Sequence, residues 1–188
     1  MKKRIQNNRE AIKPSWMDLR KNTTDREKEM PRPEMFKRSE GKQVILDKEF
    51  PNIKQKTLSE VIASRRSLRQ YKDVEMTKEE VSYLLWETSR VDFYKTSAVF
   101  RTIPTGGATN SMETYVYLQN IVGIENGLYH YIQDQHVLIL LDDSEDVKER
   151  VNQALWTQLR GANFTMFITA VPYRCEYKYG FTAHKMIA

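Results

Sequence analysis

A single cysteine, Cys175, occurs among the 188 residues, so the chain cannot form an internal disulfide. Long hydrophobic runs are also missing: the longest covers residues 137–141, far short of the roughly 20 residues that span a bilayer. Residues 1–4 are basic, but residues 5–10 are polar and supply no apolar signal segment. These absences predict a cytoplasmic protein that does not enter a membrane.

Acidic residues are under-represented in the first 56 positions, and this gives the chain its basic character. Sixteen lysines and arginines there face nine acidic residues, a net charge of +7, whereas residues 57–188 carry 14 against 16. Four of the six prolines lie in the same segment. We therefore predict two parts: a basic, mostly irregular N-terminal extension (1–56) and a folded domain (57–188).

A basic extension can bind nucleic acid or an acidic peptide, or it can pack against its own domain or a partner subunit. The sequence contains no nucleic-acid recognition motif, so we do not expect nucleic acid as a partner. Large apolar side chains that can anchor the extension to protein are Trp16, Met17, Met35 and Phe36. We therefore favour packing against protein.

Two capping-box patterns predict helix starts, one at Thr57 to Glu60 and one at Thr77 to Glu80, the second helix running to about residue 88. β-Branched and aromatic runs predict strands over 113–118, 127–132 and 136–141. A near-continuous apolar run over 164–171 predicts a buried central strand. With a further helix over about 145–155 and a short one near the end, the pattern indicates an α+β fold.

A dense cationic cluster, Arg65, Arg66, Ser67 and Arg69, follows the first predicted helix. Guanidinium groups match phosphate oxygens through paired hydrogen bonds, so this density favours an anionic ligand. The alternative is a solvated helix end whose cations complement the negative end of the helix dipole.

A second unusual stretch, residues 104–110, is rich in small residues that let a backbone approach a flat ligand closely. Its alternative is a flexible surface turn. The cationic cluster and this loop together indicate a nucleotide-type cofactor. His130 and His136 have no third ligand beside them, so we expect hydrogen-bonded histidines and no metal site. Cys175 lacks a catalytic partner pattern and is expected to be structural.

These motifs resemble those of the nitroreductase superfamily of FMN enzymes, and more closely its SagB-type dehydrogenase branch, the oxidases of thiazole and oxazole peptide biosynthesis. The cationic cluster resembles the flavin-phosphate signature. Three later segments are similar, in order, to the branch's glycine loop with its following strand, its Gly-Leu-Tyr-His-Tyr strand and its Lys-Tyr motif: 104–116, 127–131 and 178–180. Each motif alone is weak, and their order supports the assignment.

The resemblance implies an α+β nitroreductase-like fold, with a central, mostly antiparallel sheet flanked by helices, and a homodimer with two FMN sites in the subunit interface. Arg65 and Ser67, with Arg66 beside them, would hold the FMN phosphate, and Arg69 would lie at the pyrimidine edge of the ring. The loop residues that would contact the partner's flavin are Pro104, Thr105, Gly106 and Gly107. Lys178 and Tyr179 would remove a proton from the substrate.

Family members continue beyond the point where this sequence stops, so the resemblance also implies that the C-terminal part is missing. The expected function is FMN-dependent oxidation of azoline rings in a modified peptide, or a related nitroreductase-like reaction, alongside biosynthetic partner enzymes. The alternative is a truncated, non-catalytic interaction or relic subunit. The alternative reading of Lys178 and Tyr179 is an ordinary amphipathic strand end.

Overall fold

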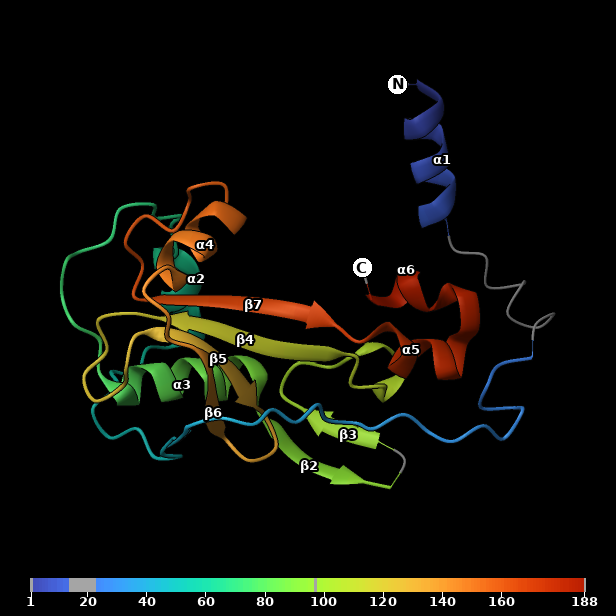
Figure 1. Cartoon of the computed structure of the whole chain (residues 1–188), viewed down its shortest axis with the longest axis horizontal. Helices are drawn as coiled ribbons and strands as arrows, with labels where there is room; N and C mark the ends of the chain where they lie inside the picture. The colour runs from blue at the N-terminus through green and yellow to red at the C-terminus, as the bar shows by residue number, and fades with distance from the viewer. Residues whose placement is uncertain (1, 14–22, 97, 188) are drawn as a thin grey trace. The chain divides into compact units, whose positions relative to one another are not determined.

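The computed structural model describes residues 2–13, 23–96 and 98–187 of the chain (Figure 1). The predicted anchors Trp16 and Met17 lie outside these residues. The helices are α1 (Lys2–Ile12), α2 (Leu58–Ser64), α3 (Lys78–Ser89), α4 (Val147–Ala154), α5 (Pro172–Tyr179) and α6 (Ala183–Ile187), with 3₁₀ turns η2 (Gly106–Ala108) and η3 (Gly180–Thr182). The strands are β1 (Gln43–Ile45), β2 (Val91–Lys95), β3 (Ala98–Arg101), β4 (Met112–Leu118), β5 (Gly127–Ile132), β6 (Val137–Asp142) and β7 (Phe164–Ala170).

The chain forms two compact units. The first contains Met1–Lys37, Phe93–Glu113 and Thr169–Ala188, and the second contains Arg38–Asp92 and Thr114–Ile168. Each unit draws on segments that are far apart in the sequence. The predicted division of the chain at residue 56 is a different one and stays a prediction.

One five-stranded sheet carries the strand order β1-β6-β5-β4-β7. β1 with β6, β6 with β5 and β5 with β4 all pair antiparallel, with Val116 opposite Tyr129 and Tyr131 opposite Leu138. β4 also runs antiparallel to β7. Gln119 N donates to Asn163 O at one end of this pair, and Val171 N donates to Ser111 O at the other. This confirms the predicted α+β fold with a mostly antiparallel sheet flanked by helices.

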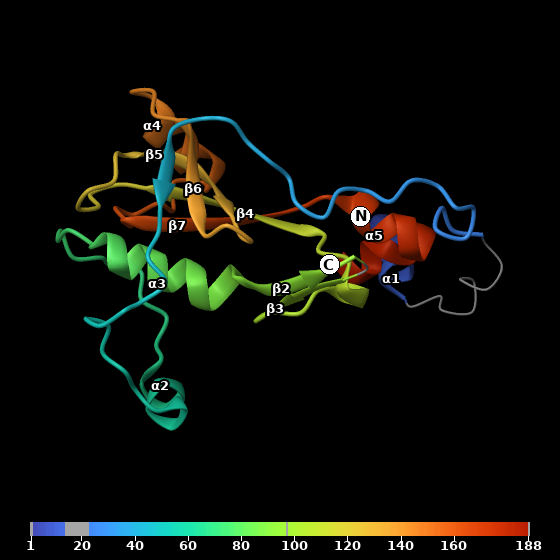
Figure 2. The ribbon, with the colours of Figure 1, turned by 90° about the horizontal axis from the view of Figure 1, so that it is seen from below.

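In the second unit, side chains that alternate along the strands give the sheet two buried faces. Val116 and Leu118 of β4 share a core with Val81 and Leu85 of α3. Tyr117, between them in sequence, packs instead with Val147 and Val151 of α4. Successive strand residues point to opposite faces, so α3 and α4 cover opposite faces of the sheet, as Figure 2 shows.

Most predicted elements are present within a few residues of their expected bounds, but the prediction of a buried central strand over 164–171 is wrong. β7 is the last strand in the sheet order, it pairs with β4 alone within the described sheet, and none of its residues is buried. A continuous apolar run shows that a strand is apolar and does not fix its place in the sheet.

The structure also contains elements that were not predicted: the helix α1, the strand β1, and the strands β2 and β3, which form a two-stranded sheet. The N-terminal extension is thus less irregular than expected, because β1 pairs with β6 over Gln43 to Ile45 and the next residue, Leu46, is buried in the core. Three residues are too few for a recognisable alternation, so that strand depends on its partner.

In the first unit, residues 23–37 of the extension pack on α5 and its surroundings. Arg26 N donates to Tyr177 O at 3.0 Å, and the Tyr177 hydroxyl donates to Met30 O at 3.1 Å. The half-buried Phe36 lies edge-on to Tyr94, with ring centroids 5.6 Å apart. Residues 23–37 are therefore held against protein, as expected of a packed extension. Among the described residues no helix combines the length and apolar character that a bilayer crossing needs.

Candidate functional site

The cationic cluster begins where α2 ends, in the second unit. The capping box closes the helix start, because Thr57 Oγ1 accepts from Glu60 N at 3.3 Å and Glu60 Oε2 accepts from Thr57 N at 2.8 Å. Arg65 is the C-cap residue, and the chain leaves the helix there in an extended conformation. The cluster therefore lies on exposed, non-helical backbone.

The members of the cluster have different surroundings. Arg66 Nη1 donates to Ala63 O at 3.0 Å and to Arg65 O at 2.8 Å, so this guanidinium satisfies carbonyls at the helix end. Arg65 Nη1 donates a long hydrogen bond to Ser67 Oγ, at 3.4 Å. Arg65, Ser67 and Arg69 remain exposed, and together they offer the donor set that suits a phosphate. The helix-end alternative thus describes Arg66 better than its neighbours.

The glycine loop lies in the first unit and is ordered by its own hydrogen bonds. Asn110 N donates to Thr105 Oγ1 at 3.0 Å, and Ala108 N donates to Thr105 O at 3.0 Å. Gly107 has a φ of 60°, which glycine adopts without strain. A Cβ placed there would lie 1.8 Å from the Tyr179 hydroxyl oxygen. The absence of a side chain at Gly107 is therefore required by the neighbouring ring.

Lys178 and Tyr179 are at the C-terminal end of the helix α5, so the strand-end alternative is wrong, and they lie directly against this loop. Lys178 Nζ donates to Gly107 O at 2.9 Å and lies 5.2 Å from the centroid of the Tyr179 ring. Both side chains are half-buried. The structure thus brings together three of the predicted site residues, Gly107, Lys178 and Tyr179.

A buried ion pair supports the same region. Arg174 Nη1 and Glu113 Oε1 are 2.5 Å apart, and both side chains are at most 4% exposed. Arg174 Nε also donates to Glu34 O at 2.7 Å, and Lys37 N donates to Glu113 Oε1 at 2.9 Å. The pair therefore ties residues 34–37 of the extension to α5 and to the start of β4.

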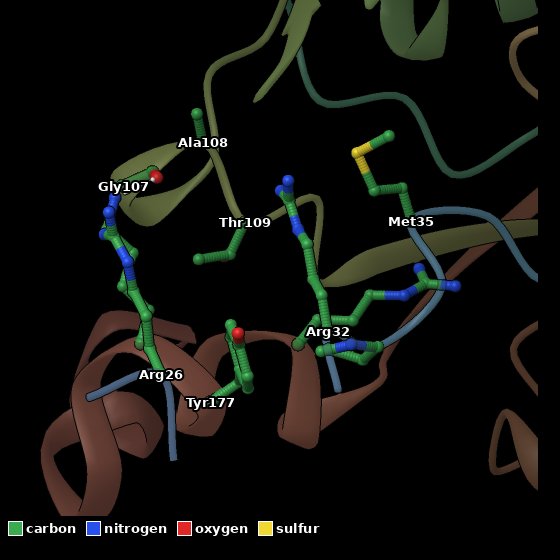
Figure 3. Close-up of a pocket in the computed structure, with 10 residues that line it drawn as sticks. Arg26, Arg32, Met35, Gly107, Ala108, Thr109 and Tyr177 are labelled. Carbon is green, nitrogen blue, oxygen red and sulfur yellow. Dashed lines mark hydrogen bonds between the residues drawn. The ribbon is translucent and has the colours of Figure 1, made fainter. Parts of the chain in front are cut away.

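A cavity of about 290 Å³ lies between the extension, the glycine loop and α5, all within the first unit (Figure 3). Its lining residues are Arg26, Arg32, Pro33, Met35, Gly107, Ala108, Thr109, Arg174, Tyr177 and Lys178. In Figure 3 the side chains of Arg26 and Arg32 extend from the extension toward the loop that holds Gly107 to Thr109. Sequence reasoning placed only Gly107 and Lys178 at a site. The only sequence feature that pointed to Arg26 and Arg32 was the basic charge of the extension. Charge alone does not predict where a side chain will lie in the fold.

The two strand-region histidines have hydrogen-bond partners, as expected. His130 Nδ1 lies 2.8 Å from Ser39 Oγ, and its ring stacks on Tyr115. His136 is buried, and burial lowers its pKa below the usual value. Burial likewise raises the pKa of the Cys175 thiol, which favours its protonated form. Among the described residues no three histidine, cysteine, aspartate or glutamate side chains gather as a metal site would require.

A sequence profile of the Nitroreductase family matches residues 62–185, which is about two thirds of the chain. The chain belongs to the nitroreductase family. The match begins within α2 and ends within α6, so it includes the cationic cluster, the glycine loop and Lys178 with Tyr179.

Individual relatives agree with this membership. The curated "Putative nitroreductase MJ1384" of Methanocaldococcus jannaschii is 34% identical over 97 residues, which are 52% of this chain and 48% of the relative. The chain therefore spans about half the length of the curated nitroreductase relative that it matches.

Solved structures show the same fold. A protein from Anabaena variabilis, described as a putative nitroreductase, aligns with a TM-score of 0.68 and 22% identity over 97% of this chain and 34% of its own. A protein from Ralstonia eutropha with the same description aligns with a TM-score of 0.54 and 17% identity over 84% of this chain and 68% of its own. At these identities the likeness concerns the fold alone.

Proposed function

We propose that this chain is part of an FMN-dependent oxidoreductase. The observation that carries the proposal is the extent of the family match, which spans every residue suggested for cofactor contact or catalysis, from Arg65 to Tyr179. The residues present also fit the group chemically, because Arg65, Ser67 and Arg69 offer exposed donors for a phosphate.

In this proposal each part of the site has its own task. Arg65 and Ser67, with Arg66, hold the phosphate, and Arg69 provides positive charge at the pyrimidine edge of the ring. Pro104, Thr105, Gly106 and Gly107 contact the flavin held by the partner subunit. FMN, when bound, supplies the acceptor for a hydride from the substrate.

Lys178 is the proposed general base, with Tyr179 beside it. A neutral lysine amine keeps two N–H donors and gains a lone pair. It can therefore hold its hydrogen bond to Gly107 O and still accept a proton from a substrate carbon. Support for these roles comes from the contact of Lys178 and Tyr179 with the glycine loop.

The finer proposal is the SagB-type reaction, in which an azoline ring of a modified peptide becomes an azole. The ring loses a proton to the base and a hydride to the flavin, so two hydrogens leave and the ring gains a double bond. This assignment rests on the motif order from the cationic cluster to Lys178-Tyr179. It includes a homodimer, a peptide substrate, biosynthetic partner enzymes and a cytoplasmic location.

The first test is a titration of FMN, followed by flavin fluorescence, into the 188-residue chain and two variants. Arg65→Ala should weaken binding by about 1.5–3 kcal/mol, the range for a hydrogen bond to a charged group. Lys56→Ala is the matched control, because it removes an exposed cation just before α2 and outside the cluster. Equal affinities for Arg65→Ala and the parent would refute the phosphate assignment.

The second test separates binding from turnover. Lys178→Gln keeps a donor for Gly107 O, so it should bind FMN like the parent while peptide oxidation falls by about 100-fold or more. Mass spectrometry of an azoline peptide reports the loss of two hydrogens. A parent chain that binds FMN without oxidising any azoline peptide would instead favour the alternative, a non-catalytic interaction subunit.

A further inference from the structure

The cavity of the first unit has an unusual charge composition. Of its ten lining residues four are cationic and none is acidic: Arg26, Arg32, Arg174 and Lys178 are the cations. Arg174 is neutralised by the buried Glu113 behind the cavity wall. Arg26 and Arg32 belong to the exposed extension, and Lys178 belongs to the half-buried end of α5.

Two of these side chains donate to backbone carbonyls. Arg32 donates to the Thr96 carbonyl, and Lys178 donates to the Gly107 carbonyl at 2.9 Å. The Arg26 guanidinium makes no hydrogen bond or ion pair within the described part of the chain, although its charge does act on the carboxylate of neighbouring Glu27. Its five N–H donors are thus open to a ligand on the cavity side.

The other walls are suited to an organic group. Pro33, Met35 and the Tyr177 ring provide apolar surface beside the cations. The volume of about 290 Å³ lies at the lower end of the range for small-molecule sites, so the cavity admits a small ligand or one small group of a larger substrate. A cation-lined cavity with apolar walls is suited to a small organic carboxylate, because the guanidinium fork pairs with its two oxygens.

We propose that this cavity binds the carboxylate of a small organic anion, with Arg26 and Arg32 as its principal donors. Resting on the proposed flavin chemistry, we further infer that the carboxylate belongs to the substrate and is held next to Lys178. Arg26 and Arg32 are then specificity-determining residues that select acidic substrates over neutral ones.

The experiment is a ligand-observed NMR titration of the full 188-residue chain with benzoate and with benzamide, its neutral analogue of similar shape. Benzoate should bind at least about tenfold more tightly than benzamide, and added salt should weaken it. Arg26→Gln should lose about tenfold in benzoate affinity and leave benzamide unchanged.

Lys28→Gln is the matched control. It removes the same charge two residues away, from a side chain that pairs with Asp25 and does not line the cavity. It should keep the benzoate affinity of the parent. Equal binding of benzoate and benzamide, no binding of either, or equal losses in Arg26→Gln and Lys28→Gln would each overturn the proposal.

Two further arms identify the source of the anion. Inorganic phosphate should compete with benzoate weakly, because it lacks the apolar body. FMN should not compete, and Arg26→Gln should bind FMN like the parent. Competition by FMN that is lost in Arg26→Gln would assign the cavity to the cofactor phosphate and refute a substrate site. None of these titrations needs turnover, so a chain that fails to bind FMN still gives a clear benzoate result.

Discussion

At the scale of single residues, a feature of the local sequence can be explained by a contact with a residue far away along the chain. The small residues of the glycine loop indicate close backbone approach. In the structure the approaching group includes the Tyr179 ring, since a Cβ at Gly107 would lie 1.8 Å from its hydroxyl oxygen. The loop thus has a structural reason for its glycine in addition to the proposed flavin contact.

His136 is a second residue whose role depends on its neighbours. Tyr131 Oη lies 2.6 Å from Nδ1, while Nε2 lies 2.8 Å from Ser82 Oγ and 3.0 Å from Asp47 O. A neutral imidazole meets all three if Tyr131 donates to Nδ1 and Nε2–H is shared between the Asp47 carbonyl and Ser82 Oγ, whose own proton is donated to the Asp47 carbonyl. Protonation would place a second donor against the Tyr131 hydroxyl inside the core.

We therefore predict that stability falls as pH decreases through the range in which histidine titrates. The folded pKa of His136 is lowered by burial, so the unfolded chain takes up a proton near pH 6.5 that the folded chain does not. Urea unfolding at steps from about pH 7 to about pH 5.5 should show a falling free energy of unfolding.

His136→Asn is the comparison variant for this prediction. Asparagine tolerates the positive φ of 58° at this position and does not titrate, so the fall over the same pH range should be smaller. An identical pH dependence in the parent and in His136→Asn would contradict the assignment.

At the scale of elements, α2 and α3 share one local design and differ in their surroundings. Both begin with a complete capping box, at Thr57 and at Thr77. α3 buries Val81 and Leu85 in the core, whereas no residue of α2 is buried. Figure 2 shows α2 set apart from the sheet of the second unit. The cap therefore stabilises a core helix in one case and a peripheral helix in the other.

The two caps should consequently respond differently to the same substitution. Thr77→Ala should lower the global free energy of unfolding by about 1 kcal/mol, because α3 unfolds with the core. Thr57→Ala should leave the global value unchanged and accelerate amide exchange over 61–65, because α2 can open locally. A similar loss of global stability in both variants would show that α2 is part of the cooperative core.

At the scale of the whole molecule, we predict a homodimer, since the proposed flavin contacts of the glycine loop reach a partner subunit. Three apolar side chains in and just after α2 are exposed and fit burial in an interface. Leu58 is 75% exposed, Ile62 is 68% exposed and Leu68 is 74% exposed. An interface that joins whole subunits should bury more than about 2,000 Å².

Sedimentation velocity at micromolar protein with FMN present measures this directly. The dimer should persist at high ionic strength, because salt screens attraction between charges and an apolar interface depends little on such attraction. Leu58→Asp should shift the chain toward monomer, while Leu141→Asp, at a 40% exposed position on β6, should not. A parent chain that sediments as a monomer throughout would refute the predicted assembly.

The sequence by itself determined the elements whose signals are local. Capping boxes located the starts of α2 and α3, and alternation or continuous apolar character located β4, β5, β6 and β7. These signals work because caps and side-chain periodicity depend on residues within a few positions of one another. The order of the motifs was likewise enough to indicate the nitroreductase family, which the profile match establishes.

Tertiary structure alone decided what those elements meet. It paired the three residues of β1 with β6, left the apolar face of α2 exposed, and brought Arg26 and Arg32 of the extension to a cavity beside Lys178. It also set Tyr179 against Gly107 across 72 positions of sequence. Such contacts depend on long-range packing. The type of a residue and its neighbours in sequence do not identify the distant segment that will pack against it.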